Sequence, residues 1–224
     1  MTDLHTSSEA LVAGAPAAAA RAGVVLIHGR GASADSMLDF ERALDVDAVA
    51  YRAAEADGRI WYPESFLAPL DRNEPYLSAA LARIDAEVNA LLASGLPEQK
   101  ICLLGFSQGA CLSLEYAART GRHLGAVLAL SGGLIGSAQL GLGRDDADKA
   151  FEYDANLAST KFFLGCSDVD AHIPLSRVQL SGKVLEALGA DVDVRIYPGM
   201  GHTVNADEVQ AIRDILGKIC EEAQ

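Results

Sequence analysis

Ser107 is the residue whose neighbours most clearly indicate chemistry. It stands between Gly105 and Gly109 in GFSQG, which matches the pattern G-x-S-x-G. The apolar run 101–104 before it has the length of a buried strand, and apolar residues at helical spacing follow it. Such a strand-to-helix turn is tight enough to require its glycines, and the N–H groups that open the helix face a developing anion. We therefore predict a nucleophilic serine, the alternative being a purely structural turn.

A serine hydroxyl needs a general base, and His202 can take its proton near neutral pH. His202 follows the loop PGMG, which we expect to deliver it to the site, although a loop or capping histidine is the alternative. An ionised aspartate would hold the imidazole in the required tautomer. Asp168 and Asp170 compete for that role, and either one gives the chain order Ser, Asp, His that α/β-hydrolases use.

An alternation of apolar strands and amphipathic helices must position these residues. Strands are predicted near 10–12, 24–27, 46–53, 101–104, 125–131, 160–165 and 192–197, and helices at 33–44, 76–92, after Ser107, at 174–188 and from Asn205. This alternation indicates an α/β fold with a mainly parallel sheet and helices on both faces, built as a single domain over 1–224. Since each polar cluster follows a strand end, all should meet at one sheet edge.

Length and composition limit the classes of function. With 224 residues, half of them hydrophobic, the chain suits a globular domain with a sizeable core. The formal net charge of -13 disfavours nucleic acid and anionic membrane as partners. The four cysteines lack metal-type spacing, and neither a signal sequence nor a membrane span is visible. We therefore expect no metal, no cofactor, no membrane insertion and a cytoplasmic protein.

Two segments show no regular spacing of apolar residues. Residues 58–75 concentrate the only Trp together with a Tyr, a Phe and three Pro. A long irregular loop in a compact domain is often functional, and a surface loop pinned by its own aromatic residues is an equal alternative. Residues 132–159 are rich in Gly and Asp, and we expect either a flexible loop or a short partial cap there.

Four segments together resemble the phospholipase/carboxylesterase family of α/β-hydrolases, which includes bacterial carboxylesterases and acyl-protein thioesterases. They are HGRG at 28–31, GFSQG, GCSDVDAHIP at 165–174 and PGMGH at 198–202. The resemblance runs from about Val24 onward and implies an α/β-hydrolase fold without a large lid. The family's catalytic aspartate stands directly before a short x-x-hydrophobic-Pro run, which selects Asp170 and leaves Asp168 a structural role.

The resemblance also implies an oxyanion hole made by the backbone N–H groups of Gln108 and Arg30, with His28 supporting the loop. Many relatives carry an apolar residue where this chain has Arg30, so its guanidinium would add a positive charge beside the site. Cys166, although close to Asp170 in sequence, is expected to be a buried and inert thiol.

We predict a serine hydrolase that cleaves carboxylic esters through Ser107, Asp170 and His202 and an acyl-enzyme intermediate. Its partner would be a small-molecule ester, with a homodimer as one option. The alternatives are a thioesterase acting on acylated proteins or thiol carriers, and a catalytically idle binding protein of the same fold.

Substrate contacts are expected from Arg30 and from three aromatic residues of the 58–75 loop, Trp61, Tyr62 and Phe66. Such a pocket suits a modest acyl or aryl group with a polar or negative end. The alternative for Arg30 is a guanidinium that points into solvent or pairs with an acid such as Glu64 or Glu74.

Overall fold

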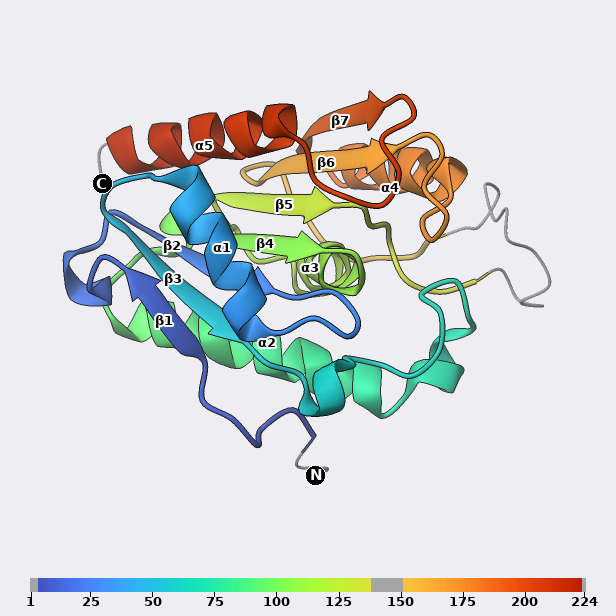
Figure 1. Ribbon diagram of the computed structural model, residues 1–224, viewed down its shortest axis with the longest axis horizontal. Helices are drawn as coiled ribbons and strands as arrows, with labels where there is room; N and C mark the ends of the chain where they lie inside the picture. The colour runs from blue at the N-terminus through green and yellow to red at the C-terminus, as the bar shows by residue number, and fades with distance from the viewer. Residues whose placement is uncertain (1–3, 138–150, 223–224) are drawn as a thin grey trace.

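A seven-stranded sheet lies at the centre of the computed structural model, which describes residues 4–137 and 151–222 (Figure 1). Across the sheet the strands follow the order β1-β3-β2-β4-β5-β6-β7. All neighbouring pairs are parallel except β1 and β3, which run antiparallel at one edge. The strands are β1 (Leu11–Gly14), β2 (Ala22–Ile27), β3 (Val49–Ala54), β4 (Ile101–Phe106), β5 (Ala126–Leu130), β6 (Lys161–Ser167) and β7 (Asp191–Tyr197).

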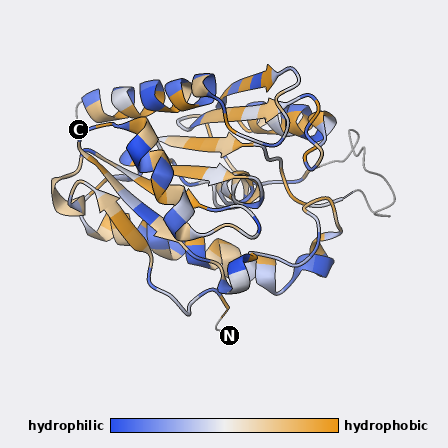
Figure 2. Cartoon of the chain, viewed as in Figure 1, coloured by the Kyte–Doolittle hydropathy of each residue, from blue (hydrophilic) through white to orange (hydrophobic). Residues whose placement is uncertain are grey.

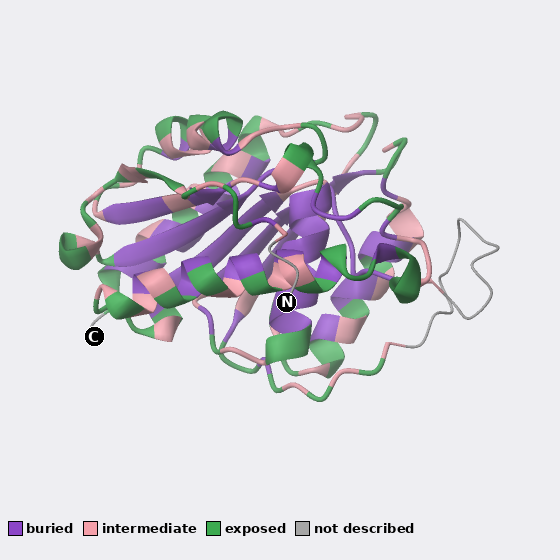
Figure 3. Cartoon of the chain, turned by 90° about the horizontal axis from the view of Figure 1, so that it is seen from below, coloured by how far each residue is buried: buried purple, intermediate pink, exposed green. Residues whose placement is uncertain are grey.

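Helices cover both faces of this sheet, as predicted. One face carries α1 (Ala34–Leu44) and α5 (Ala206–Glu221), and the other carries α2 (Tyr76–Ala93), α3 (Gln108–Thr120) and α4 (Leu175–Ala187). In Figure 2 the strands are mainly hydrophobic, whereas the helices that cover them carry both hydrophobic and hydrophilic residues. Figure 3 shows the central strands buried and the helices exposed along one side. Strands β2 and β5 are therefore apolar throughout, because neither face meets water.

The register of the parallel strands brings the chemistry-bearing turns to one edge, on the right in Figure 1. Ile27 at the end of β2 lies opposite Gly105 of β4, and Phe106 lies opposite Leu130 of β5. The turn after β2 comes so close to the turn after β4 that a Cβ added to Gly29 would lie 3.2 Å from the Cβ of Ser107. The convergence predicted from the strand ends is confirmed.

Element boundaries differ from the sequence predictions at two strands. The strand predicted from residue 46 begins at Val49, because Asp45 and Ala48 take positive φ angles of 47° and 61° and form a turn instead. The strand predicted to end at residue 165 continues to Ser167. This extension places Ser167 beside the loop that carries His202.

The 58–75 loop is fixed to the protein by its aromatic residues. Trp61 and Tyr62 are 0% and 1% exposed, and the buried Asn73 side chain bonds the main chain at Glu64 and Ser65. Residues 138–150 of the predicted 132–159 segment lie outside the described residues. Within the described ranges no α-helix or strand forms a large lid over the sheet edge, and no helix is long and apolar enough to cross a membrane.

Candidate active site

The turn between β4 and α3 has the close main-chain contacts of a nucleophile elbow. Ser107 takes φ 56° and ψ -116° directly before α3. A Cβ added to Gly105 would lie 2.2 Å from the carbonyl oxygen of Gly109, and one added to Gly109 would lie 2.0 Å from that of Ile27. Both positions therefore need glycine, and the positive φ of Ser107 is strain of the kind that active sites hold.

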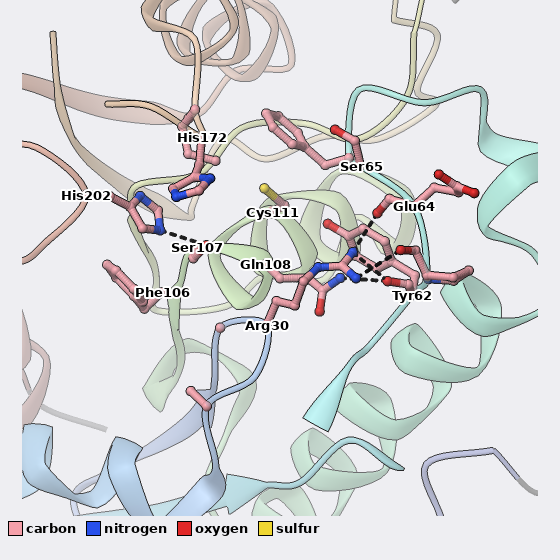
Figure 4. A pocket seen from close by; sticks show the side chains of 15 residues that line it. Arg30, Tyr62, Glu64, Ser65, Phe106, Ser107, Gln108, Cys111, His172 and His202 are labelled. Carbon is pink, nitrogen blue, oxygen red and sulfur yellow. Dashed lines mark hydrogen bonds between the residues drawn. The ribbon is translucent and has the colours of Figure 1, made fainter. Parts of the chain in front are cut away.

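Side chains from three separate loops form a continuous hydrogen-bond chain at this edge. His202 Nε2 lies 3.0 Å from Ser107 Oγ (Figure 4), and His202 Nδ1 lies 2.7 Å from Asp170 Oδ2. Because a carboxylate only accepts, Nδ1 carries the proton and Nε2 can receive one from the serine. The arrangement can deprotonate the hydroxyl and stabilise the imidazolium that results.

Asp170 is held as a carboxylate by its surroundings. Its side chain is fully buried, and Oδ1 accepts hydrogen bonds from the N–H groups of His172 and Ile173 at 2.8 and 3.0 Å. Burial alone would raise the pKa of Asp170, but the bonds from His202 and from these two N–H groups outweigh burial, and the pKa lies below its ordinary value. The carboxylate is therefore ionised at neutral pH.

Asp168 holds the loop that carries the histidine. Its Oδ1 accepts a 2.7 Å hydrogen bond from the Gly199 N–H, and Ser167 Oγ accepts a 3.0 Å bond from the Gly201 N–H. Of the two aspartates that compete in the sequence, Asp170 contacts His202, whereas Asp168 contacts main chain three residues before it.

An open pocket of about 480 Å³ lies beside Ser107. Ser107 and His202 line it together with Arg30, Tyr62 and Phe66, three of the four predicted substrate contacts. Further apolar lining comes from Ala32, Pro63, Phe106, Cys111 and Ile173. The structure therefore places a largely apolar cavity of modest size next to Ser107.

Two predictions for this pocket need correction. Trp61 is fully buried behind the pocket wall and does not line it, because its indole N–H donates to the carbonyl oxygen of His28 at 2.9 Å. Arg30 is an exposed residue, as one alternative expected, but within the described residues its guanidinium does not pair with Glu64 or Glu74. It donates to the main-chain oxygens of residues 62, 63 and 64.

His28 supports the turn that follows β2, as the resemblance implies. Its ring is buried, Nδ1 donates to the Gly29 oxygen at 2.7 Å, and Nε2 accepts from the Ala56 N–H at 3.0 Å. Burial lowers the pKa of His28, and the bond from Ala56 requires an unprotonated Nε2. His28 is therefore a neutral structural histidine.

All four cysteines are free and buried. Burial raises the pKa of the Cys166 thiol to about 12, which agrees with the expected inert thiol. Among the residues that the structure describes, no group of three or more His, Cys, Asp or Glu side chains could hold a metal ion.

Two residues of the site, Phe106 and His172, and the side-chain role of a third, Gln108, escaped the sequence analysis. The rings of Phe106 and His172 flank the His202 ring, with centroids 4.9 and 4.8 Å away. The side chain of Gln108 bonds main chain of the 58–75 loop, at Trp61 and Tyr62. Position inside GFSQG and GCSDVDAHIP was the available signal, but it does not reveal what a side chain touches.

The chain is similar in sequence to two curated fungal proteins. The chain is 34% identical over 125 residues to acyl-protein thioesterase 1 of Gibberella zeae, an alignment that covers 56% of this chain and 50% of that protein. With acyl-protein thioesterase 1 of Neurospora crassa the identity is 29% over 123 residues, covering 55% and 47%. The chain thus spans about half the length of the curated relatives it matches.

A solved structure aligns over nearly the whole chain. The phospholipase/carboxylesterase from Dyadobacter fermentans is 38% identical, with a TM-score of 0.84 and coverage of 94% of this chain and 97% of that one. The family model described as phospholipase/carboxylesterase matches residues 9–220. This chain therefore belongs to the phospholipase/carboxylesterase family of α/β-hydrolases.

Proposed function

We propose that this protein is a serine hydrolase that cleaves carboxylic esters of small molecules. The observation that carries the proposal is the chain from Ser107 Oγ through the His202 imidazole to the Asp170 carboxylate, at the wall of an open pocket. Membership of a hydrolase family supports it independently.

The reaction begins when His202 Nε2 takes the hydroxyl proton of Ser107 while Oγ attacks the ester carbonyl carbon. The imidazolium, stabilised by Asp170, then gives that proton to the departing alkoxide, and an acyl-serine remains. A water molecule, deprotonated by the same Nε2, attacks the acyl carbon. Collapse of the second tetrahedral intermediate releases the acid and returns the proton to Ser107. No step in this sequence calls on a cofactor.

The negative charge that develops on the carbonyl oxygen would be met by the main-chain N–H groups of Arg30 and Gln108. Within the described residues, neither N–H is engaged by a protein acceptor, and Gln108 opens α3, where the helix dipole favours an anion. Each such donor lowers the barrier by about 3 kcal/mol.

The pocket favours an acyl or aryl group of modest size. Tyr62, Phe66 and Phe106 offer apolar faces, and the volume of about 480 Å³ is in the range of small-ligand sites. Because main-chain oxygens occupy the Arg30 guanidinium, a negative end on the substrate is not needed to explain that residue.

Thioester hydrolysis is the second candidate. The same acyl transfer serves a thiolate leaving group, and a relative named acyl-protein thioesterase 1 shares 34% identity over half of its length. A small-molecule ester partner remains a prediction of the first activity, whereas the second would act on acylated proteins or thiol carriers. A cytoplasmic location remains a prediction for both.

A matched pair of substrates tests the proposal. The purified chain is assayed with aryl esters of graded acyl length and with a thioester of the same acyl group, and its serine is labelled with a fluorophosphonate. We expect ester turnover and time-dependent labelling that Ser107→Ala abolishes. A higher kcat/KM for the thioester would favour the second candidate, and a chain that binds but neither turns over nor labels would be an idle binding protein.

A further inference from the structure

The residues Trp61, Tyr62, Pro63 and Glu64, called here the 61–64 segment, are held by side chains from other parts of the chain, and all of them except Trp61 line the pocket. Arg30 contributes three of these bonds, and Gln108, Asn73 and His5 contribute the others among the described residues. Arg30 Nη2 donates to the oxygens of Tyr62 and Glu64 at 2.8 and 2.7 Å, and its Nη1 donates to that of Pro63 at 2.9 Å. Figure 4 shows the guanidinium extended toward this segment and away from His202.

Gln108 binds the same segment from the other side. Its side-chain Oε1 accepts from the Trp61 N–H, and its Nε2 donates to the Tyr62 oxygen, both at 2.9 Å. The Tyr62 oxygen thus receives one bond from Arg30 and one from Gln108. Gln108 is 5% exposed, so both of its bonds are shielded from water.

The segment in turn bonds the turn that follows β2. The Trp61 indole N–H donates to the His28 oxygen, two residues before Arg30. The indole lies between two histidine rings, with centroids 5.4 Å from His5 and 5.0 Å from His28. The turn is therefore tied to the segment at two points, through the oxygen of His28 and through the side chain of Arg30.

Arg30 and Gln108 are also the two residues whose main-chain N–H groups are proposed to bind the oxyanion. We propose that Arg30 is a positioning residue, whose guanidinium fastens its own turn to the 61–64 segment and so fixes the direction of its N–H toward the oxyanion. This inference rests on the proposed function. Because transition-state stabilisation depends on preorganised donors, a mobile turn would lower kcat while changing substrate binding little.

The shape of the guanidinium, more than its charge, suits this task. A planar fork can reach three successive carbonyl oxygens from one position, whereas the ammonium of lysine is a single point of charge. Within the described residues Arg30 has no carboxylate in ion-pair distance, and the nearby Glu64 carboxylate faces Arg72 at 3.7 Å. Lysine at position 30 should therefore fail although it keeps the charge.

Arg30→Lys and Arg30→Met test this proposal, with Arg72→Lys and Arg72→Met as matched controls. Arg72 neighbours the same segment and is largely exposed, and among the described residues its guanidinium pairs only with the Glu64 side chain. For each variant, kcat and KM are measured with a neutral aryl ester and with a carboxylate-bearing analogue. Emission of Trp61, the only tryptophan of the chain, reports directly on the fastened segment.

We expect both Arg30 variants to lose about 10- to 100-fold in kcat for both esters, with KM changed by less than about 3-fold. Trp61 emission should shift to the red and become more accessible to acrylamide, while cooperative thermal unfolding is retained. The Arg72 variants should stay within about 2-fold of wild type in every constant.

Three results would overturn the proposal. A fully active Arg30→Lys would mean that charge alone matters, and a KM increase confined to the anionic ester would make Arg30 a substrate contact. Unchanged kcat and Trp61 emission in Arg30→Met would leave the guanidinium with no positioning role. A wild-type chain that neither hydrolyses the esters nor takes up a fluorophosphonate instead overturns the proposed function, and the emission measurement still decides whether Arg30 holds the segment.

Discussion

The two sides of the Ser107 hydroxyl are built in different ways. The oxyanion side, made of residues 28–31, the 61–64 segment and the start of α3, is fastened by neutral side chains and one arginine bonded to main chain. The base side, made of residues 167–173 and 198–208, is fastened by carboxylates, among them Asp168 on Gly199 and Asp170 on His202. In the proposed mechanism, the donors on the first side must keep a fixed position, whereas the second side must move a proton.

This difference extends to the buried ionisable groups behind each side. On the oxyanion side, His5 and His28 are buried, and burial lowers the pKa of both. On the base side, burial raises the pKa of Glu208 to about 7, and its Oε1 has no hydrogen-bond partner among the described residues. Low pH should therefore destabilise the oxyanion side, and high pH should destabilise the base side.

Removing the residue shared by both sides should have the largest effect. Ser107→Ala eliminates the nucleophile, and we expect kcat for ester hydrolysis to fall by about 10⁶-fold. The free energy of unfolding should change by less than about 1 kcal/mol, because the hydroxyl carries little packing. Steady-state assays and chemical denaturation measure the two quantities. A variant that retains near-normal turnover would show that another residue attacks the ester.

The base side is tested next by its two aspartates. Asp170→Asn should lower kcat by about 10⁴-fold, because an amide favours the wrong imidazole tautomer. Asp168→Asn is the matched control, since its amide oxygen can still accept from the Gly199 N–H. We expect it to lose at most about 10-fold, well below the effect of a lost triad member. The kcat values of the two variants are compared at equal concentrations of folded protein. A larger loss in Asp168→Asn than in Asp170→Asn would make Asp168 the partner of His202.

Glu208 should give the base side its own pH dependence. Its Oε2 accepts from the Asn205 N–H, while Oε1 lies against Gly165. With a pKa of about 7 in the fold against 4.5 for a free side chain, the native state loses stability as pH rises from about 4.5 to 7. Glu208→Gln keeps the acceptor for Asn205 and should be more stable at pH 8 by up to about 3 kcal/mol, and equal near pH 4.

Urea denaturation across this pH range measures the Glu208 effect. Glu221→Gln, on an exposed residue of the same helix, is the matched control and should show no such gain. A Glu208→Gln variant that is less stable than wild type at pH 8 would show that the ionised carboxylate is well accommodated.

The smallest effect is expected at His5 on the oxyanion side. His5 Nδ1 accepts from the Asp57 N–H and Nε2 donates to the Trp61 oxygen, so the ring must be neutral. Because burial lowers the pKa of His5 below the usual 6.5, its contribution to stability is present above pH 6.5 and lost as pH falls below it. When the pH falls from 7.5 to 5, the free energy of unfolding of His5→Gln should decrease by about 1 kcal/mol less than that of wild type.

Thermal or chemical unfolding at the two pH values measures the His5 effect. The exposed His123 provides the matched control, and His123→Gln should follow wild type. If wild type and His5→Gln show the same pH dependence of stability, the contacts of His5 do not make the oxyanion side acid-sensitive.

Much of the fold was predictable because its signals are local. The apolar runs of β2, β4 and β5 and the stripe of α2 follow from periodicity, and the strand ends alone bring residues 28–31, Ser107, 167–170 and His202 to one edge. The start of β3 was misjudged because Val46 and Ala48 alternate with two aspartates as in a half-buried strand, and only the positive φ angles of Asp45 and Ala48 reveal the turn.

The sequence by itself determined the elbow around Ser107, the order of the three candidate triad residues and, through family resemblance, the preference for Asp170. Only the tertiary structure decided what Arg30 and Trp61 do. Their partners are main-chain oxygens 32 to 34 and 33 residues away, and an amide carbonyl looks the same at every position of a sequence. A side chain that bonds main chain therefore leaves no pattern, which is why Trp61 was taken for a substrate contact and Arg30 for a charge beside the site.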